Sequence, residues 1–269
     1  MTGDTNGVWD IFVRDTVVGA TIRASVSSSG EQGNGSSFRN AFGAGYLDLG
    51  RDGRYVAYCS SATNLVAGDT NAAVDVFRHD LVTRETILVS AGAGGTQADG
   101  PSSWSSISSG GRYVAFGSSA TNLVAGDTGG RDDVFLRDCD SGQTTRVSVA
   151  TDGTEAGGKS GDSWGYPAVS SDGRYVAFAS EAKNLTPGEL ASKSWDLYVR
   201  DLQAQTTFRA SIPIPGGSIE SHSCLYPSVS RDGRFVAYHS AWSALVPGDT
   251  NGWGDVFVRD LFGYSPPTP

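Results

Sequence analysis

One sequence unit of about sixty residues recurs along this chain, and this repeat constrains the fold more than any other feature. Each copy carries a Gly-Arg pair before an apolar run, with the arginine at Arg54, Arg112, Arg174 or Arg234. Successive arginines are 58, 62 and 60 residues apart. Repetition at a fixed period indicates that one small structural unit is stacked against copies of itself.

Each unit has the pattern of four short β-strands. A segment such as "YPAVSS" (166–171) precedes a "DGR" turn, and a run that is apolar on both faces, such as "YVAYCS" (55–60), follows it. The third strand carries an aromatic column at Phe12, Phe77, Phe135, Tyr198 and Phe257. The fourth strand is rich in β-branched residues and lies in 20–26, 85–91, 144–150 and 206–212. With 36 glycines for tight turns and no long amphipathic helical pattern, the chain is predicted to be all-β.

The linked columns also resemble a known family. The series "SDGRYVAFAS", "NL", "GDTNG", "DVFVRD" and "TTRVSV" resembles the WD40-like propeller repeat (PD40) of the TolB-like family over nearly the whole chain. The resemblance implies a β-propeller of four-stranded antiparallel blades in a bacterial protein that is extracellular, on the cell surface or periplasmic. It does not specify a function, because such repeats serve in binding, scaffolding and enzyme accessory domains.

The repeat divides residues 1–269 as one propeller domain. We expect four complete blades or five repeat units. The predicted divisions are a half repeat at 1–46, repeats at 47–103, 104–165 and 166–225, a partial repeat at 226–262 and a tail at 263–269.

The two ends of the chain share a phrase, "GDTNGVWDIFVRD" at 3–15 and "GDTNGWGDVFVRD" at 248–260. Pairing of residues 20–26 with residues 256–260 would close four blades and leave residues 11–15 as a spare edge strand, and an edge recruits partners. Three arrangements follow: a closed four-bladed ring, an open fan of five units, or an oligomer that exchanges terminal strands. A piece of a longer propeller is a fourth reading.

Acidic loops before the third strands are candidate calcium sites. Two aspartates six residues apart, often with an asparagine between them, offer the oxygen ligands that Ca²⁺ takes. The same residues also cap tight turns without any metal, and "NG" is a common turn dipeptide. The candidate ligands are Asp4, Asn6, Asp10, Asp69, Asn71, Asp75, Asp127, Asp133, Asp249, Asn251 and Asp255.

Several tryptophans break the repeat and are therefore candidate contacts for a ligand. Aromatic side chains near polar groups in loops suit a protein or a glycan. The alternative is that they seal the loops against the blades. These residues are Trp104, Trp164, Trp195, Trp242 and Trp253.

Charge narrows the function further. The net charge of −9 argues against nucleic-acid binding, and no stretch is long and apolar enough for membrane insertion.

We expect a non-catalytic module that binds a protein or glycan, or that self-associates through its terminal strands. A propeller hydrolase or lactonase with a channel metal is an alternative, but Asp48 is the one carboxylate on the expected inner strands. A purely structural array is the third reading.

Overall fold

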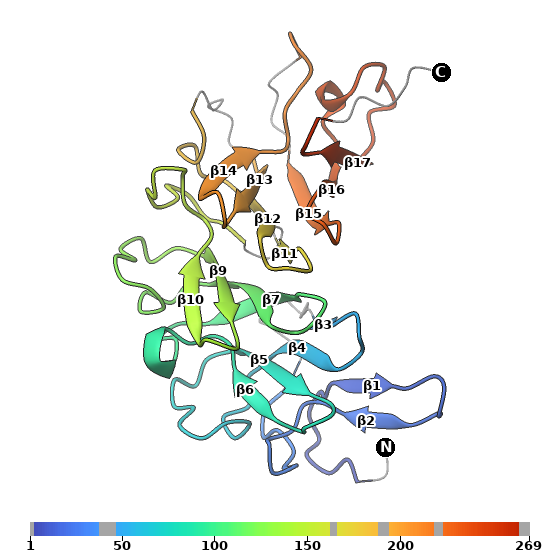
Figure 1. The fold of residues 1–269 in the computed structure, drawn as a ribbon, viewed down its shortest axis with the longest axis vertical. Helices are drawn as coiled ribbons and strands as arrows, with labels where there is room; N and C mark the ends of the chain where they lie inside the picture. Colours follow the sequence, from blue (N-terminus) through green and yellow to red (C-terminus); the bar gives the residue numbers. More distant parts are fainter. Residues whose placement is uncertain (1–2, 38–46, 162–165, 188–193, 218–222, 264–269) are drawn as a thin grey trace.

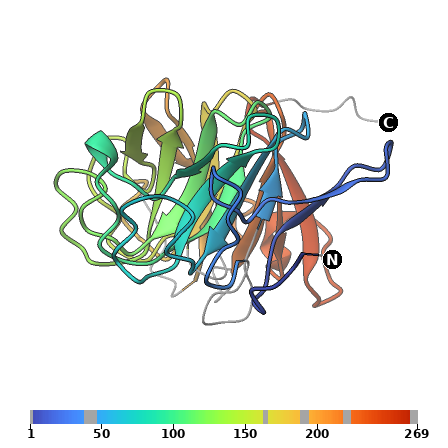
Figure 2. The same ribbon diagram turned by 90° about the horizontal axis from the view of Figure 1, so that it is seen from below.

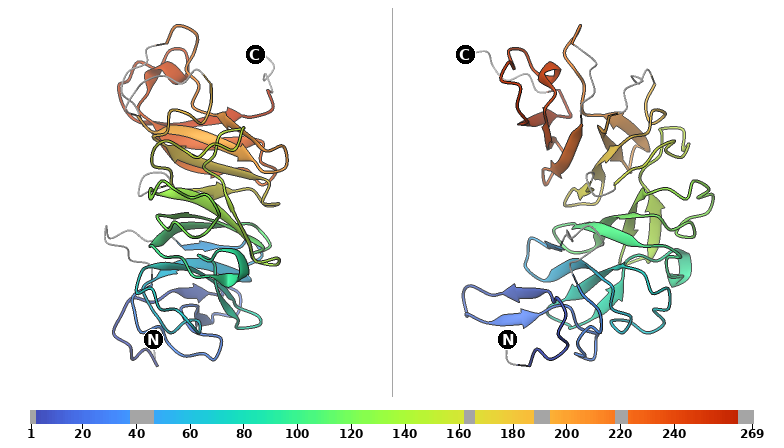
Figure 3. Two further views of the ribbon diagram at one scale, coloured as in Figure 1. Left: turned by 90° about the vertical axis from the view of Figure 1, so that its left-hand side faces the viewer. Right: turned by 180° about the vertical axis from the view of Figure 1, so that it is seen from behind.

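The chain folds into a row of antiparallel sheets. A computed structural model describes residues 3–37, 47–161, 166–187, 194–217 and 223–263, and in them five sheets follow one another in sequence order. The sheets fan out along an arc like the blades of an incomplete propeller (Figures 1 and 3). The predicted all-β propeller fold is confirmed. No helix in these ranges has the length and apolar character of a membrane-spanning segment.

Three sheets are complete and two are partial. The first sheet is the hairpin β1 (Phe12–Arg14) and β2 (Thr21–Arg23), and the last is β15 (Cys224–Val229), β16 (Phe235–Ser240) and β17 (Asp255–Asp260). The complete sheets are β3 (Leu47–Leu49), β4 (Tyr55–Ser60), β5 (Asp75–Asp80) and β6 (Thr86–Leu88); β7 (Ser102–Ile107), β8 (Tyr113–Ser118), β9 (Asp133–Asp138) and β10 (Gln143–Arg146); and β11 (Ala168–Val169), β12 (Tyr175–Ser180), β13 (Asp196–Asp201) and β14 (Thr206–Arg209). Two short 3-10 turns, η1 (Ala93–Gly95) and η2 (Ser243–Leu245), lie in connecting loops.

The hydrophobic core lies between successive sheets. On β4, Val56 and Tyr58 pack toward the first unit, and Ala57 and Cys59 pack toward the third. This is the two-faced burial that alternation predicts for a strand covered on both sides. Seen from below, the strands of successive sheets lie side by side (Figure 2).

The turn before each second strand, "DGR" or "GGR", lets neighbouring sheets pack closely. Gly111, Gly173 and Gly233 have φ values of +75°, +75° and +73°, where a side chain is strained. A Cβ on each would collide with the tyrosine that begins the second strand of the preceding unit, such as Tyr55 for Gly111. Glycine is therefore required both by the turn and by the close approach of neighbouring sheets.

The recurrent Arg and Asp residues hold one sheet internally and tie it to the next. Arg174 of the "GR" pair donates to both carboxylate oxygens of Asp201, at 3.0 and 2.7 Å. Arg54, Arg112 and Arg234 make the equivalent pairs within their own sheets. The arginine of the "RD" pair reaches the preceding unit instead, because Arg137 donates to the carbonyl of Ala91 at 2.9 Å.

Of the three arrangements expected for the chain ends, the structure shows the open fan of five units and not the ring closed by residues 20–26. In the described residues β2 pairs with β1, β17 pairs with β16, and the two partial sheets lie at opposite ends of the arc (Figure 1). A hairpin closed by six residues costs far less chain entropy than pairing across more than two hundred. The arrangement is the open fan of five units, and residues 11–15 are not a spare strand.

Candidate functional site

An aspartate stands at the entrance of every third strand, and we call these five residues the entrance aspartates: Asp10, Asp75, Asp133, Asp196 and Asp255. In four units, the Oδ1 atom of this aspartate accepts a hydrogen bond from a serine that follows the fourth strand, at 2.5–3.0 Å. These serines are Ser25, Ser90, Ser148 and Ser211. The hydrogen bond of the entrance aspartate therefore joins the end of the fourth strand to the start of the third.

The Oδ2 atom has an asparagine partner in three units. Asn71 donates from Nδ2 to Asp75 at 2.9 Å, and its Oδ1 accepts the amide of Ala73, also at 2.9 Å. Asn6 and Asn251 make the same two contacts in the first and last units. The asparagine oxygen thus closes a turn and the nitrogen faces the carboxylate. These are the contacts of the plain-turn alternative.

The outer aspartates of these three loops differ in their partners. Asp4 is ion-paired with Arg23 at 3.1 Å. Asp69 accepts a bond from Nε2 of Gln97 at 2.7 Å, and the same nitrogen reaches Asp75 at 3.1 Å. Gln97 therefore bridges the two carboxylates of the second unit as a donor.

The third unit brings three carboxylates together. Oxygens of Asp127, Asp133 and Glu155 all lie within 4.8 Å of one another. Arg146 is 3.1 Å from Glu155 and 3.6 Å from Asp127. Both oxygens of Asp127 and the Oδ2 of Asp133 are buried without a hydrogen-bond partner among the described residues. The predicted ligands Asp127 and Asp133 are thus joined by Glu155, which lies far along the sequence.

Burial dominates the electrostatics of this cluster. Removal from water raises the pKa of Asp133 to about 7, against the opposing effect of the Ser148 hydrogen bond. Burial also raises the pKa of Asp127, although Arg146 favours its ionised form. A buried carboxylate without donors needs either a proton or a cation to satisfy it.

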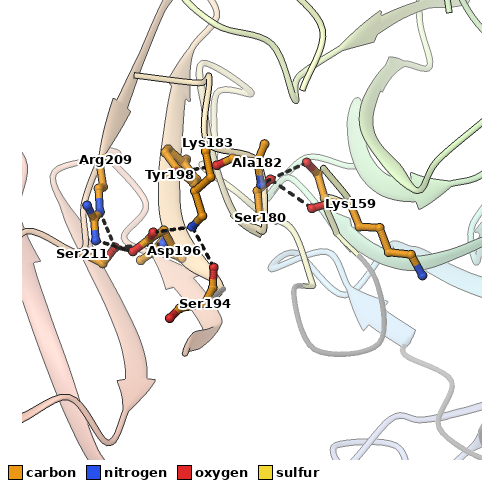
Figure 4. Close-up of polar contacts among 11 residues, drawn as sticks. Lys159, Ser180, Ala182, Lys183, Ser194, Asp196, Tyr198, Arg209 and Ser211 are labelled. Atoms are coloured by element: carbon orange, nitrogen blue, oxygen red, sulfur yellow. Dashed lines mark hydrogen bonds and ion pairs between the residues drawn. The ribbon is translucent and has the colours of Figure 1, made fainter. Parts of the chain in front are cut away.

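In the fourth unit, cationic side chains of the protein contact the entrance aspartate (Figure 4). Lys183 lies 3.2 Å from the Oδ2 of Asp196, and Arg209 and Ser211 contact the Oδ1. The lysine side chain occupies the side of the carboxylate that asparagine occupies in other units. This entrance aspartate is therefore saturated by the chain itself.

The last sheet has an open edge. Beside β17 lies a groove of about 530 Å³, whose lining includes Ile212, Tyr238, Leu245, Asp249 and Arg259. On the face of β17, Val256 is 75% exposed and Val258 is 65% exposed. The matching residues of β13, Leu197 and Val199, are fully buried by the next sheet. Among the described residues, the end of the fan therefore presents the free outer edge of β17 and an uncovered apolar face together.

The strand β1 shows how the same sequence is satisfied elsewhere. Ile11, which corresponds to Val256, is 2% exposed and packs with Ala24 against the second unit. Phe12 pairs with Arg23, and Arg14 donates to Thr21 at 2.9 Å. The fourth strand that fits beside this phrase has the pattern Thr-x-Arg-x-Ser, found at 21–25, 144–148 and 207–211.

The candidate tryptophans that the structure describes do not gather into one site. Trp242 is buried under Arg209, with 5.7 Å from the guanidinium carbon to the ring centroid, whereas Trp253 is 78% exposed. Trp195 is half-buried, and Trp164 lies outside the described residues. Trp242 therefore packs its loop against the blades, which is the alternative to ligand binding, whereas Trp253 is accessible to a binding partner.

Trp104 belongs to a row of aromatics on the inner strands. Its ring centroid is 6.3 Å from that of Tyr166, which is 5.5 Å from that of Tyr226. The two tyrosines line a groove of about 460 Å³ together with Asp48. The carboxylate of Asp48 accepts the amide of Ile107 at 2.9 Å, so it is engaged by the fold.

Sequence reasoning missed Glu155, Arg146, Tyr166 and Tyr226. Glu155 has a detectable signal, because the corresponding residues of the first two units are Gln32 and Gln97. A change from amide to acid opposite the aspartates that recur in each unit adds a negative charge to the third unit. The tyrosines precede the prolines at 167 and 227 and have no signal beyond that repetition.

Comparison with known proteins shows the fold. No protein-family model and no curated protein matches this chain. Among solved structures, TolB from Acinetobacter baumannii is similar with a TM-score of 0.50 and 15% identity, covering 94% of this chain and 46% of that protein. A putative TolB from Agrobacterium tumefaciens has a TM-score of 0.50 and 13% identity, covering 94% and 70% of the two chains. The tricorn protease has a TM-score of 0.50 and 12% identity, covering 87% and 17%. The chain thus spans less than half the length of the first of these, and the likeness is one of propeller architecture.

Proposed function

We propose that this chain is a non-catalytic assembly module of the propeller type, in which copies associate head to tail by strand replacement. In the proposed contact, β17 of one copy takes the place of β1 beside β2 of a second copy. The single observation behind this proposal is that two nearly identical segments, 3–15 and 248–260, lie in different environments. Ile11 of the first is buried, whereas Val256 of the second is 75% exposed.

The register of this replacement follows from the strands themselves. Asp255, Phe257 and Arg259 stand where Asp10, Phe12 and Arg14 stand in the first unit. In the composite sheet, Ser25, Arg23 and Thr21 of the second copy would meet them in that order. The same Ser–Asp and Thr–Arg bonds are made within the third and fourth units. The outer edge of β17 is therefore chemically complementary to β2.

Burial and backbone bonding supply the driving force. The second unit of the incoming copy would cover Val256 and Val258, as it covers Ile11 in its own chain. Burying two valines that are mostly exposed contributes about 2–4 kcal/mol, before the cost of association. Displacing β1 uncovers Ile11 and so offsets part of this gain, whereas the backbone bonds that β2 makes with β1 are replaced by those with β17.

The contact joins different surfaces of the two copies. Such heterologous contacts build rings when their rotation closes and filaments when it does not. The proposal places the module outside the cytoplasm, as the resemblance implies, and needs no bound metal. Trp253, exposed beside β17, would lie at the edge of the contact.

Solution mass tests this function. We expect light scattering to show concentration-dependent oligomers for the native chain and a monomer for Val256→Asp, because a buried unpaired charge would oppose the contact. The matched control is Thr145→Asp, at an exposed residue of β10 in the third unit, in the middle of the fan. A peptide of residues 19–27 should compete with assembly, and its Arg23→Ala version should compete poorly. A native chain that stays monomeric at high concentration would contradict self-assembly.

A glycan ligand in the inner groove is a second candidate function. The row Trp104, Tyr166 and Tyr226 offers ring faces of the kind that stack on sugars. Titration with oligosaccharides should quench tryptophan fluorescence in the native chain, and Tyr226→Ala should weaken this effect. Unchanged fluorescence across neutral and acidic oligosaccharides would remove this candidate.

A further inference from the structure

The five entrance aspartates differ in one respect, which is the partner of their Oδ2 atom. In four units a nitrogen donor lies 2.9–3.2 Å from this atom: Asn6, Asn71, Lys183 or Asn251. In the third unit the asparagine position is Gly129, and the Oδ2 of Asp133 has no hydrogen-bond partner among the described residues. A position that is filled by a donor in the other units lacks one here.

The second donor is lost as well. Gln97 bridges Asp69 and Asp75 of the second unit through its Nε2 atom. The corresponding Glu155 has no hydrogen to donate to carboxylates, and it instead accepts bonds from Thr128 and the amide of Gly129, each at 3.1 Å. Within the described ranges, Asp127 consequently has two oxygens without a hydrogen-bond partner, on a side chain that is 1% exposed.

We propose that the third unit binds one calcium ion between the carboxylates of Asp127, Asp133 and Glu155. The cation takes the position that nitrogen donors occupy in the other units. This inference is independent of the proposed assembly, because the cluster lies in the middle of the fan.

The charges of the cluster fit a divalent cation. Three carboxylates face one guanidinium, that of Arg146, so two negative charges remain when all groups are ionised. In the fourth unit, Asp196 meets the two cationic side chains of Lys183 and Arg209. The third unit keeps the arginine in this column, but no lysine contacts Asp133 among the described residues, and Lys159 pairs with Asp132 instead. A bound ion supplies the missing positive charge.

The ligand chemistry favours calcium over other divalent ions. The three side chains offer carboxylate oxygens as ligands. Hard cations prefer these oxygens, whereas zinc and copper favour nitrogen and sulfur ligands. The three residues come from two separate loops, and calcium accepts the irregular geometry that results, whereas magnesium demands a near-ideal octahedron. Water and backbone oxygens complete such a shell.

The test measures bound calcium directly on the full chain. Titration calorimetry with calcium chloride should give one ion per chain for the native protein. The melting temperature should rise by roughly 5–10 °C at a calcium concentration about 100 times the Kd. Magnesium at the same concentration should give a smaller rise.

Glu155→Gln is the decisive variant, because it rebuilds the donor bridge that Gln97 makes in the second unit. We expect it to bind no calcium and to melt in chelator at or above the temperature of the native chain. Asp127→Asn should also lose the ion, which keeps the test valid if one variant folds poorly. Asp69→Asn, in the loop already saturated by Gln97, is the matched control and should bind calcium as the native chain does. Absence of calcium binding by the native chain at millimolar concentration, or unchanged binding by Glu155→Gln, would overturn the site.

Discussion

The strands β1 and β17 carry almost the same phrase but lie in opposite environments. Ile11 of the first phrase is buried at 2% exposure between β2 and the second unit, whereas Val256 of the last is 75% exposed. The repeat decides which residues point to which face. Burial, however, comes from the neighbouring sheet and the fourth strand, and these differ at the two ends of the fan.

The largest expected difference lies in the apolar residues themselves. Ile11→Ala should lower the unfolding free energy of the first unit by about 2–4 kcal/mol, because it leaves a cavity against the second unit. Val256→Ala should change it by less than about 0.5 kcal/mol in the monomer. Denaturant unfolding at low protein concentration, followed by fluorescence, measures both. Equal losses for the two variants would mean that β17 is covered within the single chain.

We expect acid to destabilise the three complete sheets more than the first sheet. A hydrogen bond from Arg174 lowers the pKa of Asp201 to about 2, and bonds from Arg54 and Arg112 lower the pKa of Asp80 and Asp138 further. A lowered folded-state pKa gives stability that is present above the unfolded value of about 3.9 and is lost as pH falls toward the folded value. The melting temperature should therefore drop between about pH 4 and pH 2.

The counterpart in the first unit is Asp15, whose pKa is lowered by the amides of Val18 and Val17 rather than by an arginine. Asp201→Asn should reduce the acid-dependent loss, and Asp15→Asn should leave it nearly unchanged, because Asp15 is solvent-exposed. Melting curves at several pH values measure the difference. A flat profile for the native chain would argue against ionised pairs in the complete units.

The smallest effects concern the arginines of the two phrases. Arg14→Ala removes the hydrogen bond to Thr21 and should cost a few tenths of a kcal/mol, because that bond is exposed. Arg259→Ala should leave monomer stability unchanged but weaken head-to-tail association several-fold. Comparing melting temperature with the dissociation constant of the oligomer separates the two roles. Loss of monomer stability in Arg259→Ala would contradict this assignment.

Much of the fold was predictable from the repeat, and the site only in part. The aromatic column places Phe77, Phe135 and Tyr198 correctly because one face pattern recurs in every unit. The sequence left open whether residues 20–26 close a ring or stay in a local hairpin, because matching end segments suggest a joint whereas the hairpin forms at lower entropic cost. The acidic loops looked alike in sequence, yet donors from distant segments distinguish them. Glu155 and Gln97 differ by one atom type, and only their positions beside the entrance aspartates give that difference meaning.

Head-to-tail strand replacement can be tested most directly by a disulfide that only two copies can form. Arg23 faces Phe12 within one chain but would face Phe257 of a second copy after replacement. In a background with Cys59, Cys139 and Cys224 changed to serine, Arg23→Cys with Phe257→Cys should give covalent oligomers under mild oxidation. Phe12→Cys with Arg23→Cys should give an internal disulfide, which confirms that the register permits the bond. Covalent oligomers from the first pair are the predicted result. A chain that remains monomeric under conditions where the second pair oxidises fully would contradict the account.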